Sequence, residues 1–315
     1  MHWAPEDLPL AISGLLAFPI TPFDADGDLE TAALRRQVAM LQSFGAQAIF
    51  PACGTGEMQS LSGDEYIRVI RACVEEVDGR IPVVAGVGFG HSIAKEMLAV
   101  ASDTGADGAL VFPPYLDPGA SMARRDYFAS LADSTELGLL VYQRGSMVFT
   151  PSEVTALSEV PNIVGIKDGT GRVDLLVRQI AAAPGKSFAF FNGVPTAELV
   201  APALRAIGID SYSSALLNFV PEIARAFYDA LAAGDTDSVA DLMARAVVPF
   251  VQLRDRAPSY AVSLVKAGVR LRGLDVGPVR PPLAMPTASD LDDLVGYING
   301  LGLDTPIHGS AKGAR

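Results

Sequence analysis

The sequence predicts an α/β protein, a TIM (β/α)8 barrel that carries a C-terminal extension of three helices. Three observations support this prediction. Eight short apolar segments alternate with amphipathic helical patterns from residue 15 onward. Most of these segments are apolar throughout, which indicates strands buried on both faces, as in a parallel sheet. Beyond residue 219 only helical periodicity remains, so a helical extension is expected there.

The first two strand–helix units begin at residue 15. Residues 15–18 are predicted to form the first strand, after which a loop rich in turn residues follows. From residue 30, apolar side chains recur at helical spacing until Gly45, a residue suited to end a helix. Residues 48–50 form the second predicted strand, and the next helical pattern ends at Asp78-Gly79. The chain therefore alternates strand and helix from its start.

Six further strands are predicted in the same alternation. They cover residues 83–85, 109–112, 139–142, 163–167, 188–191 and, as the weakest, 209–212. The helices between them are expected near residues 92–104, 122–134, 151–159, 172–182 and 196–206. Eight such units in about 200 residues favour a closed barrel over an open doubly wound sheet. Gly86, Gly88 and Gly90 superficially suggest a dinucleotide loop, but His91 stands where its third glycine should be.

No linker separates the barrel from the helices that follow it. We expect a lead-in of residues 1–14, a barrel of residues 15–218 and a packed helical extension of residues 219–304. Residues 305–315 are small or polar and are expected to fray.

Composition excludes several classes of protein. The 315 residues carry a formal charge of −12 without a basic cluster, which argues against a nucleic-acid partner. The start lacks the basic segment of a signal peptide, and no apolar stretch is long enough to span a membrane. Two cysteines do not make a disulfide framework, and Cys53 is expected only to pack. With only His91 in the body of the chain, a zinc site is not expected either, so we predict a cytoplasmic protein without a metal.

Lys167 is the strongest candidate for chemistry. It ends the apolar run Ile163-Val164-Gly165-Ile166, and none of the other four lysines ends such a run. A cation after a buried strand is costly unless it is neutralised, paired or used. The carboxyl end of a barrel strand is where a Schiff-base amine is placed. The alternative is an ordinary lysine whose ammonium group reaches solvent from the strand end.

Three other windows fall at predicted carboxyl ends of strands. Gly54, Thr55 and Gly56 expose backbone N–H groups and a hydroxyl, which suits a carboxylate, although a tight capping loop would look the same. Phe112-Pro113-Pro114-Tyr115 follows the fourth strand and Tyr142-Gln143-Arg144 ends the fifth. A tyrosine in such a position is more often part of the core. Together, however, the windows supply the carboxylate clamp and the phenol that an imine-forming lysine needs.

This combination resembles the dihydrodipicolinate synthase / N-acetylneuraminate lyase family of class I aldolases. The matching motifs are Gly-Thr-Gly-Glu at 54–57, Tyr142 and Gly-Ile-Lys-Asp at 165–168, and the resemblance covers about residues 12–290. The chain is most similar to the 5-dehydro-4-deoxyglucarate dehydratase branch. That branch also has Gly at position 54 and shares Phe-Asn-Gly at 191–193, Tyr-Ser-Ser-Ala at 212–215 and Gly-Pro-Val-Arg-Pro-Pro-Leu at 277–283.

The resemblance implies a role for each matching residue. Lys167 would form the imine and Tyr142 would move protons, while Gly54, Thr55 and Gly56 would hold the carboxylate next to the ketone. More weakly, it implies that Arg144 receives the distal carboxylate and that hydroxyl groups of the substrate meet Asn192, Ser213 and Ser214. Tyr115 would lie at a contact between subunits.

The implied reaction is dehydration and decarboxylation of 5-dehydro-4-deoxyglucarate to 2,5-dioxopentanoate, water and CO2, without a cofactor. The implied partners are a small 2-oxo sugar acid and copies of the same chain, in a homodimer or homotetramer, with neither nucleic acid nor membrane. The branch usually has Asn-Arg-Asp-Asn where this chain has Gln143-Arg144-Gly145-Ser146, so the stereochemistry of the substrate stays open. A pyruvate-dependent aldolase or synthase and a non-catalytic sugar-acid-binding relative are the alternatives.

Overall fold

The computed structural model describes residues 3–114, 119–183, 185 and 188–303. Within these residues, eight parallel strands form one sheet in the order β2-β1-β8-β7-β6-β5-β4-β3. An isolated parallel bridge between Ile49 and Val83 joins the two ends of this sheet and closes the barrel. The predicted fold class is confirmed. The strands are β1 (Leu15–Ala17), β2 (Ala48–Ile49), β3 (Val84–Phe89), β4 (Gly108–Pro114), β5 (Gly138–Gln143), β6 (Ile163–Asp168), β7 (Ala189–Asn192) and β8 (Ser211–Ser214).

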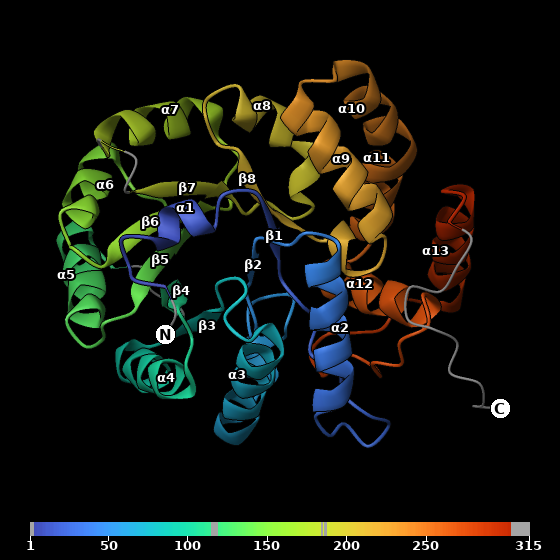
Figure 1. Ribbon diagram of the computed structural model, residues 1–315, viewed down its shortest axis with the longest axis horizontal. Coiled ribbons are helices and arrows are strands. Elements are labelled where there is room, and N and C mark those ends of the chain that lie inside the picture. The colour runs from blue at the N-terminus through green and yellow to red at the C-terminus, as the bar shows by residue number, and fades with distance from the viewer. Residues whose placement is uncertain (1–2, 115–118, 184, 186–187, 304–315) are drawn as a thin grey trace.

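Helices follow the strands and surround the barrel (Figure 1). They are α2 (Thr31–Ser43), α3 (Gly63–Val77), α4 (His91–Thr104), α5 (Ser121–Ala132), α6 (Pro151–Ser158), α7 (Val173–Ala182), α8 (Ala201–Arg205) and α9 (Pro221–Ala233). Two of them begin with side-chain caps. Ser62 and Glu65 form a reciprocal capping box at the start of α3, and Thr150 and Glu153 do the same for α6.

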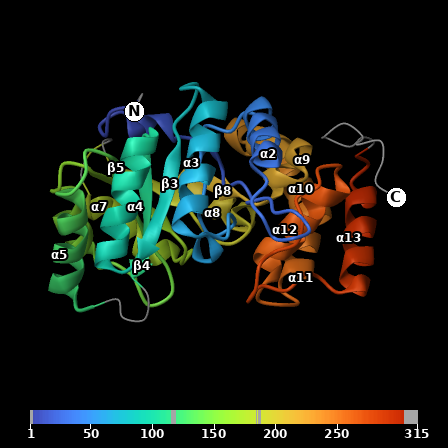
Figure 2. The ribbon, with the colours of Figure 1, turned by 90° about the horizontal axis from the view of Figure 1, so that it is seen from below.

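Further helices pack along one side of the barrel (Figure 2). They are α10 (Thr236–Leu242), a π-helical turn (Met243–Val247), α11 (Val248–Arg254), α12 (Tyr260–Leu271) and α13 (Ala288–Gly300). Three helices were expected in the extension, and α13 is an additional one that no predicted helix covers. Its first turn is polar and acidic, and of its side chains only Leu294 and Ile298 are buried among the described residues, so its helical periodicity is weak. Thr287 caps it by accepting a hydrogen bond from the Asp290 N–H at 3.2 Å.

Inside the barrel, a compact apolar core fills the space below the carboxyl ends of the strands. Leu16, Leu110, Leu140 and Val164 belong to it, one from each of four strands. The short helix α1 (Leu8–Ala11) lies across the amino ends of the strands and adds Leu8 to this core (Figure 1). Glycines begin β4 and β5 because this helix comes so close. A Cβ on Gly108 would lie 2.7 Å from Leu8 Cδ2.

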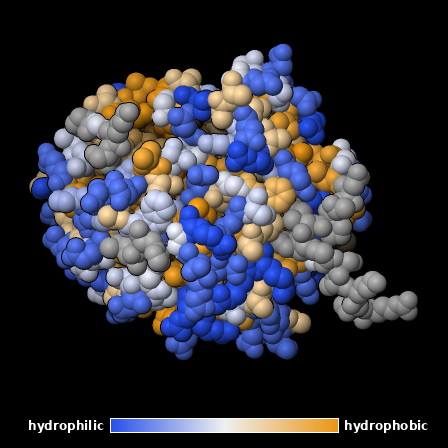
Figure 3. All heavy atoms as spheres, viewed as in Figure 1, coloured by the Kyte–Doolittle hydropathy of each residue, from blue (hydrophilic) through white to orange (hydrophobic). Residues whose placement is uncertain are grey.

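A larger apolar core lies between the strands and the surrounding helices. Successive strand residues therefore contribute alternately to the inside of the barrel and to this outer layer, which explains why most of the strands are apolar. The exception is β8, with the sequence Ser-Tyr-Ser-Ser, which begins two residues later than the strand predicted at 209–212. On the surface, hydrophilic side chains gather over α2 and α3, and apolar ones are scattered (Figure 3). In the described part of the chain, no helix is both long and apolar enough to cross a membrane.

Candidate active site

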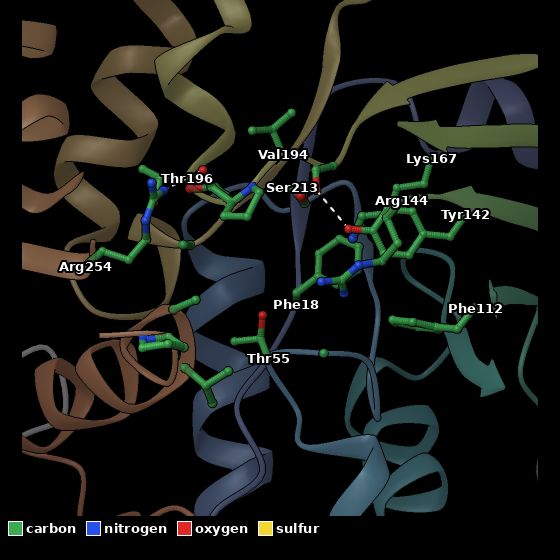
Figure 4. Close-up of a pocket in the computed structure, with 18 of the residues that line it drawn as sticks. Phe18, Thr55, Phe112, Tyr142, Arg144, Lys167, Val194, Thr196, Ser213 and Arg254 are labelled. Carbon is green, nitrogen blue, oxygen red and sulfur yellow. Dashed lines mark hydrogen bonds between the residues drawn. The ribbon is translucent and has the colours of Figure 1, made fainter. Parts of the chain in front are cut away.

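A cavity of about 390 Å³ opens at the carboxyl ends of the strands (Figure 4). This volume is typical of a site for a small ligand. All four predicted windows contribute residues to it, because loops that follow different barrel strands converge at this face. The lining residues include Phe18, Gly54, Thr55, Gln59, Phe112, Tyr142, Arg144, Lys167, Gly193, Val194, Pro195, Thr196, Ser213, Ser214, Arg254 and Val262.

Strand register places the principal side chains of this cavity at one level. Lys167 on β6 pairs with Tyr142 on β5 and with Phe191 on β7. Since side chains alternate along a strand, residues at the same level of a parallel barrel point to the same side. Tyr142 and Phe191 belong to the core inside the barrel, so Lys167 points inward with them.

Lys167 is 5% exposed and is surrounded by aromatic rings. Its Nζ lies 3.6 Å from the ring centroid of Phe18 and 4.7 Å from that of Tyr142. No carboxylate among the described residues forms an ion pair with it. Burial lowers the pKa of Lys167 to about 7; the Cys53 thiol opposes this shift and the Arg144 guanidinium adds to it. A large fraction of the amine is therefore neutral near pH 7, which is the form that attacks a carbonyl carbon.

Gly193 leaves the space through which the aliphatic part of the Lys167 side chain passes. A Cβ at this position would lie 2.4 Å from Lys167 Cε and 2.5 Å from its Cγ, so only glycine leaves room for the side chain. The carbonyl oxygen of Gly193 also accepts a hydrogen bond from the Tyr142 hydroxyl at 3.0 Å. Burial raises the pKa of Tyr142, which keeps the phenol protonated at neutral pH. One glycine thus contacts both side chains.

The loop after β2 reaches the cavity through Gly54 and Thr55. Gly56 does not line it in the described structure; its carbonyl oxygen accepts a hydrogen bond from Thr21 Oγ1 at 2.6 Å. Glu57 ends the loop with a left-handed backbone (φ +54°). Its fully buried carboxylate accepts hydrogen bonds from Lys266 Nζ at 2.8 Å and from the Arg280 N–H at 2.8 Å. The extension therefore holds this loop from behind.

The sequence matches the profile of a known protein family over nearly its whole length. The profile of the Dihydrodipicolinate synthetase family matches residues 11–299. The chain belongs to this family.

Curated relatives cover nearly the whole chain. A protein of Streptomyces griseus subsp. griseus named "Probable 5-dehydro-4-deoxyglucarate dehydratase" is 46% identical over 91% of this chain and 91% of its own length. A protein of the same name from Rhizobium meliloti is 42% identical over 94% of this chain and 98% of its own length. The resemblance stated from the sequence is confirmed at the level of the family, and these names are those of the predicted branch.

Solved structures of the family superpose closely. Dihydrodipicolinate synthase from Oceanobacillus iheyensis superposes with a TM-score of 0.88 at 25% sequence identity. The superposition covers 95% of this chain and 99% of the synthase chain. A prophage protein of the dihydrodipicolinic acid synthase family from E. coli K12, solved in complex with pyruvate, has a TM-score of 0.84 at 25% identity. It covers 93% of this chain and is covered to 99%.

The remaining predicted residues of this family member divide into two groups. Ser213 and Ser214 line the cavity, as does Arg144, which is exposed at its rim. Asn192 is not among the described lining residues. Its side chain donates to Ala197 O at 2.8 Å and accepts from the Val194 N–H at 3.1 Å, so it shapes the loop that carries Gly193. Tyr115 lies outside the described residues.

Gln143, which replaces the Asn usual in the dehydratase branch, lies behind the cavity and does not line it in the described structure. Gln143 is fully buried and donates to Asp168 Oδ1 at 2.8 Å and to Gln179 Oε1 at 2.9 Å. This network connects β5 and β6 to α7. Since Gly145 and Ser146 are exposed and are absent from the described lining, these three positions do not form the wall of the cavity.

Several lining residues of this family member had no predicted role. Phe18, Gly193, Thr196 and Arg254 are the main ones. Phe18 and Gly193 follow or end predicted strands, which was a usable signal. Arg254 ends a helix of the extension, and nothing in its local sequence indicates that it faces the barrel.

Proposed function

We propose that this member of the dihydrodipicolinate synthetase family is a 5-dehydro-4-deoxyglucarate dehydratase, which converts its substrate to 2,5-dioxopentanoate, water and CO2. The observation that carries the chemistry is Lys167, buried without a carboxylate partner among the described residues and with a pKa of about 7. The curated relatives at 42–46% identity support the choice of substrate.

The reaction begins at the 2-oxo acid end of the substrate. Neutral Lys167 attacks the C5 ketone, and loss of water gives a protonated imine. The N–H groups of Gly54 and Thr55, with the Thr55 hydroxyl, hold the C6 carboxylate beside it. The imine acidifies the C4 methylene group, and Tyr142 moves the protons. The resulting enamine expels the C3 hydroxyl as water and leaves a conjugated imine.

The conjugated imine then accepts the electrons of decarboxylation. The bond between C1 and C2 breaks, its electron pair moves through C2–C3 and C4–C5 to the imine nitrogen, and CO2 leaves. The product is a dienamine with an enol at C2. Protonation of the carbon chain and tautomerisation of this enol give the aldehyde, and hydrolysis releases 2,5-dioxopentanoate and regenerates Lys167.

Borohydride trapping during turnover of 5-dehydro-4-deoxyglucarate tests the proposal. Intact mass and peptide mapping should find a reduced adduct on Lys167 whose mass shows loss of water and CO2. Free pyruvate as a product would instead indicate an aldolase of the same family. Binding without turnover or adduct would indicate a non-catalytic relative. If neither 5-dehydro-4-deoxyglucarate nor pyruvate gives a reduced adduct on Lys167, the proposal of imine chemistry is overturned.

We further infer from the family resemblance that the enzyme is a cytoplasmic homodimer or homotetramer. Sedimentation equilibrium of the purified chain tests the assembly, since a monomeric mass at micromolar concentration would contradict it.

A further inference from the structure

The reaction above uses one end of the cavity and leaves the other without a role. Figure 4 shows Lys167, Tyr142 and Arg144 on one side of the cavity and Arg254 with Thr196 on the opposite side, with Thr55 and Ser213 between them. The substrate class of the proposed function has a carboxylate at each end of a six-carbon chain. A cation across the cavity from the lysine is therefore informative about substrate choice.

Arg254 presents free hydrogen-bond donors to this space. Its side chain is 13% exposed, and its Nη1 donates to Pro195 O at 2.6 Å. Nε donates to Asp255 Oδ1 at 2.9 Å, and Nη2 lies 2.7 Å from the same oxygen. One N–H on each Nη is left without a partner among the described residues. Asp255 is 61% exposed, so water screens it and it neutralises the guanidinium only weakly.

Thr196 supplies an independent sign of a ligand. It is 2% exposed and lines the cavity, and its Oγ1 has no hydrogen-bond partner among the described residues. Its backbone is left-handed (φ +52°), a conformation that is strained for a β-branched residue. Buried hydroxyl groups are normally paired, and strained residues concentrate at functional sites. A ligand oxygen at this position would complete the pairing.

A second acidic group near this end, Glu198, does not cancel the positive charge either. Glu198 is fully buried and accepts a hydrogen bond from Ser214 Oγ. Burial raises the pKa of Glu198 to about 7, while the Ser214 hydrogen bond and the Arg254 charge oppose that shift. A carboxyl group that is largely neutral below pH 7 leaves Arg254 as the dominant charge beside Thr196.

We propose that Arg254 and Thr196 form a subsite for the distal carboxylate of a six-carbon 2-oxo dicarboxylic acid. This inference rests on the proposed function and names the residues that select its substrate class. It reassigns the distal carboxylate from Arg144, whose guanidinium carbon lies 5.5 Å from the Tyr142 ring and therefore at the imine end. The extension, through α11, thus selects a dicarboxylate over a monocarboxylate.

A competition between two matched ketoacids tests the subsite. 2-Oxoadipate and 2-oxohexanoate both present a 2-oxo acid to Lys167 and differ at the far end, where one has a carboxylate and the other a methyl group. Equimolar mixtures are reduced with borohydride, and the two adducts are compared by intact mass. The parent enzyme should prefer 2-oxoadipate by roughly 10- to 100-fold, the contribution of charge-assisted hydrogen bonds.

Four variants identify which side chains cause the preference for 2-oxoadipate over 2-oxohexanoate. Arg254→Gln should abolish it, and Thr196→Val, which keeps the side-chain volume, should reduce it a few-fold. Arg144→Gln should retain it. Arg245→Gln is the matched control, because Arg245 is exposed and pairs only with Asp241 among the described residues. A preference that survives in Arg254→Gln, or that disappears in Arg144→Gln alone, overturns the proposal.

A second measurement separates this proposal from the imine chemistry. Calorimetric titration with adipate and hexanoate needs no reaction with Lys167. Arg254→Gln should bind adipate about tenfold or more weakly than the parent and hexanoate equally well. If neither ketoacid is trapped by the parent, the proposed function fails while this titration still decides the subsite. Equal adipate affinity in the parent and Arg254→Gln overturns the subsite.

Discussion

Two buried lysines of this protein lie in contrasting environments. Lys167 lies near the carboxyl end of β6, inside the barrel among Phe18, Tyr142 and Phe191, with no carboxylate paired to it in the described structure. Lys266, in α12, is fully buried as well, but its Nζ lies 2.8 Å from the carboxylate of Glu57. Burial lowers the pKa of both side chains, and for Lys266 the Glu57 carboxylate opposes this shift.

The difference teaches that burial alone does not make a lysine reactive. An unpaired buried amine loses its proton and becomes a nucleophile if a cavity gives substrate access to it. A buried amine bonded to a carboxylate is held in one place and connects two parts of the fold. The following predictions test whether Lys167 is needed for turnover and Lys266 for stability.

The largest effect is expected for Lys167→Met, which keeps the length of the side chain but removes the nucleophile. Turnover should fall by roughly 10⁴-fold or more, because the covalent route is lost. The free energy of unfolding at pH 7 should not fall, since the variant no longer has to desolvate an amine. Steady-state rates and urea unfolding check both statements. A variant that retains a tenth of the parental rate would contradict the role of Lys167.

Lys266→Met should show the opposite pattern. Removing one partner of a buried ion pair leaves Glu57 uncompensated, so the free energy of unfolding should fall by about 3–5 kcal/mol. Urea unfolding measures this loss. The double variant Glu57→Gln/Lys266→Met should recover part of it, because no buried charge is then left alone. If the double variant is less stable than Lys266→Met, the pair does not behave as a coupled unit.

Gly193→Ala should impair chemistry while leaving most of the stability. The new Cβ would force the Lys167 stem aside, and a displacement of about 1 Å is enough to cost on the order of 10²-fold in rate. The rate of borohydride trapping with pyruvate measures the effect. Gly296→Ala, in α13, is the control, since a Cβ there meets open space. Equal rates in the two variants would show that the contact with Lys167 is unimportant.

The smallest expected effect concerns pH. Because the pKa of Lys167 is lowered to about 7, the neutral amine accumulates as pH rises through 7, well below the range of an ordinary lysine. The rate of trapping with pyruvate should therefore rise with a midpoint near pH 7 and fall about tenfold per unit below it. Arg144→Gln removes a positive charge nearby and should move the midpoint upward. A midpoint near pH 10 would refute the effect of burial.

These contrasts also show how much the sequence could predict. Most of the strands are apolar because they are buried on both faces, so the barrel was predictable from local pattern. The exception is β8 (Ser-Tyr-Ser-Ser), which was predicted two residues too early because its own residues are mostly polar. Lys167 was predictable for the same reason, because a charge at the end of such a run has few explanations. Its role as an imine-forming residue stays a prediction until the trapping experiment is done.

Features that depend on distant contacts were not predictable from local pattern. Arg254 meets Pro195 and Thr196 only because α11 folds back over the barrel, and no periodicity encodes that meeting. Lys266 did carry a signal, since it interrupts an apolar run between Val265 and Ala267. That signal indicates a buried partner without naming it, because Glu57 lies 209 positions earlier in the chain.

The ion pair between Glu57 and Lys266 has a consequence for how the protein is synthesised. A ribosome makes Glu57 long before Lys266 and Arg280, and elements near the amino end tend to fold first. During that interval, the barrel strands and Lys167 exist, but the carboxylate of Glu57 has no cation to meet. Until those residues are made, the loop of Gly54 and Thr55 lacks the contacts that hold it from behind. We therefore expect this loop to take its final position only after the last helices of the extension have been synthesised.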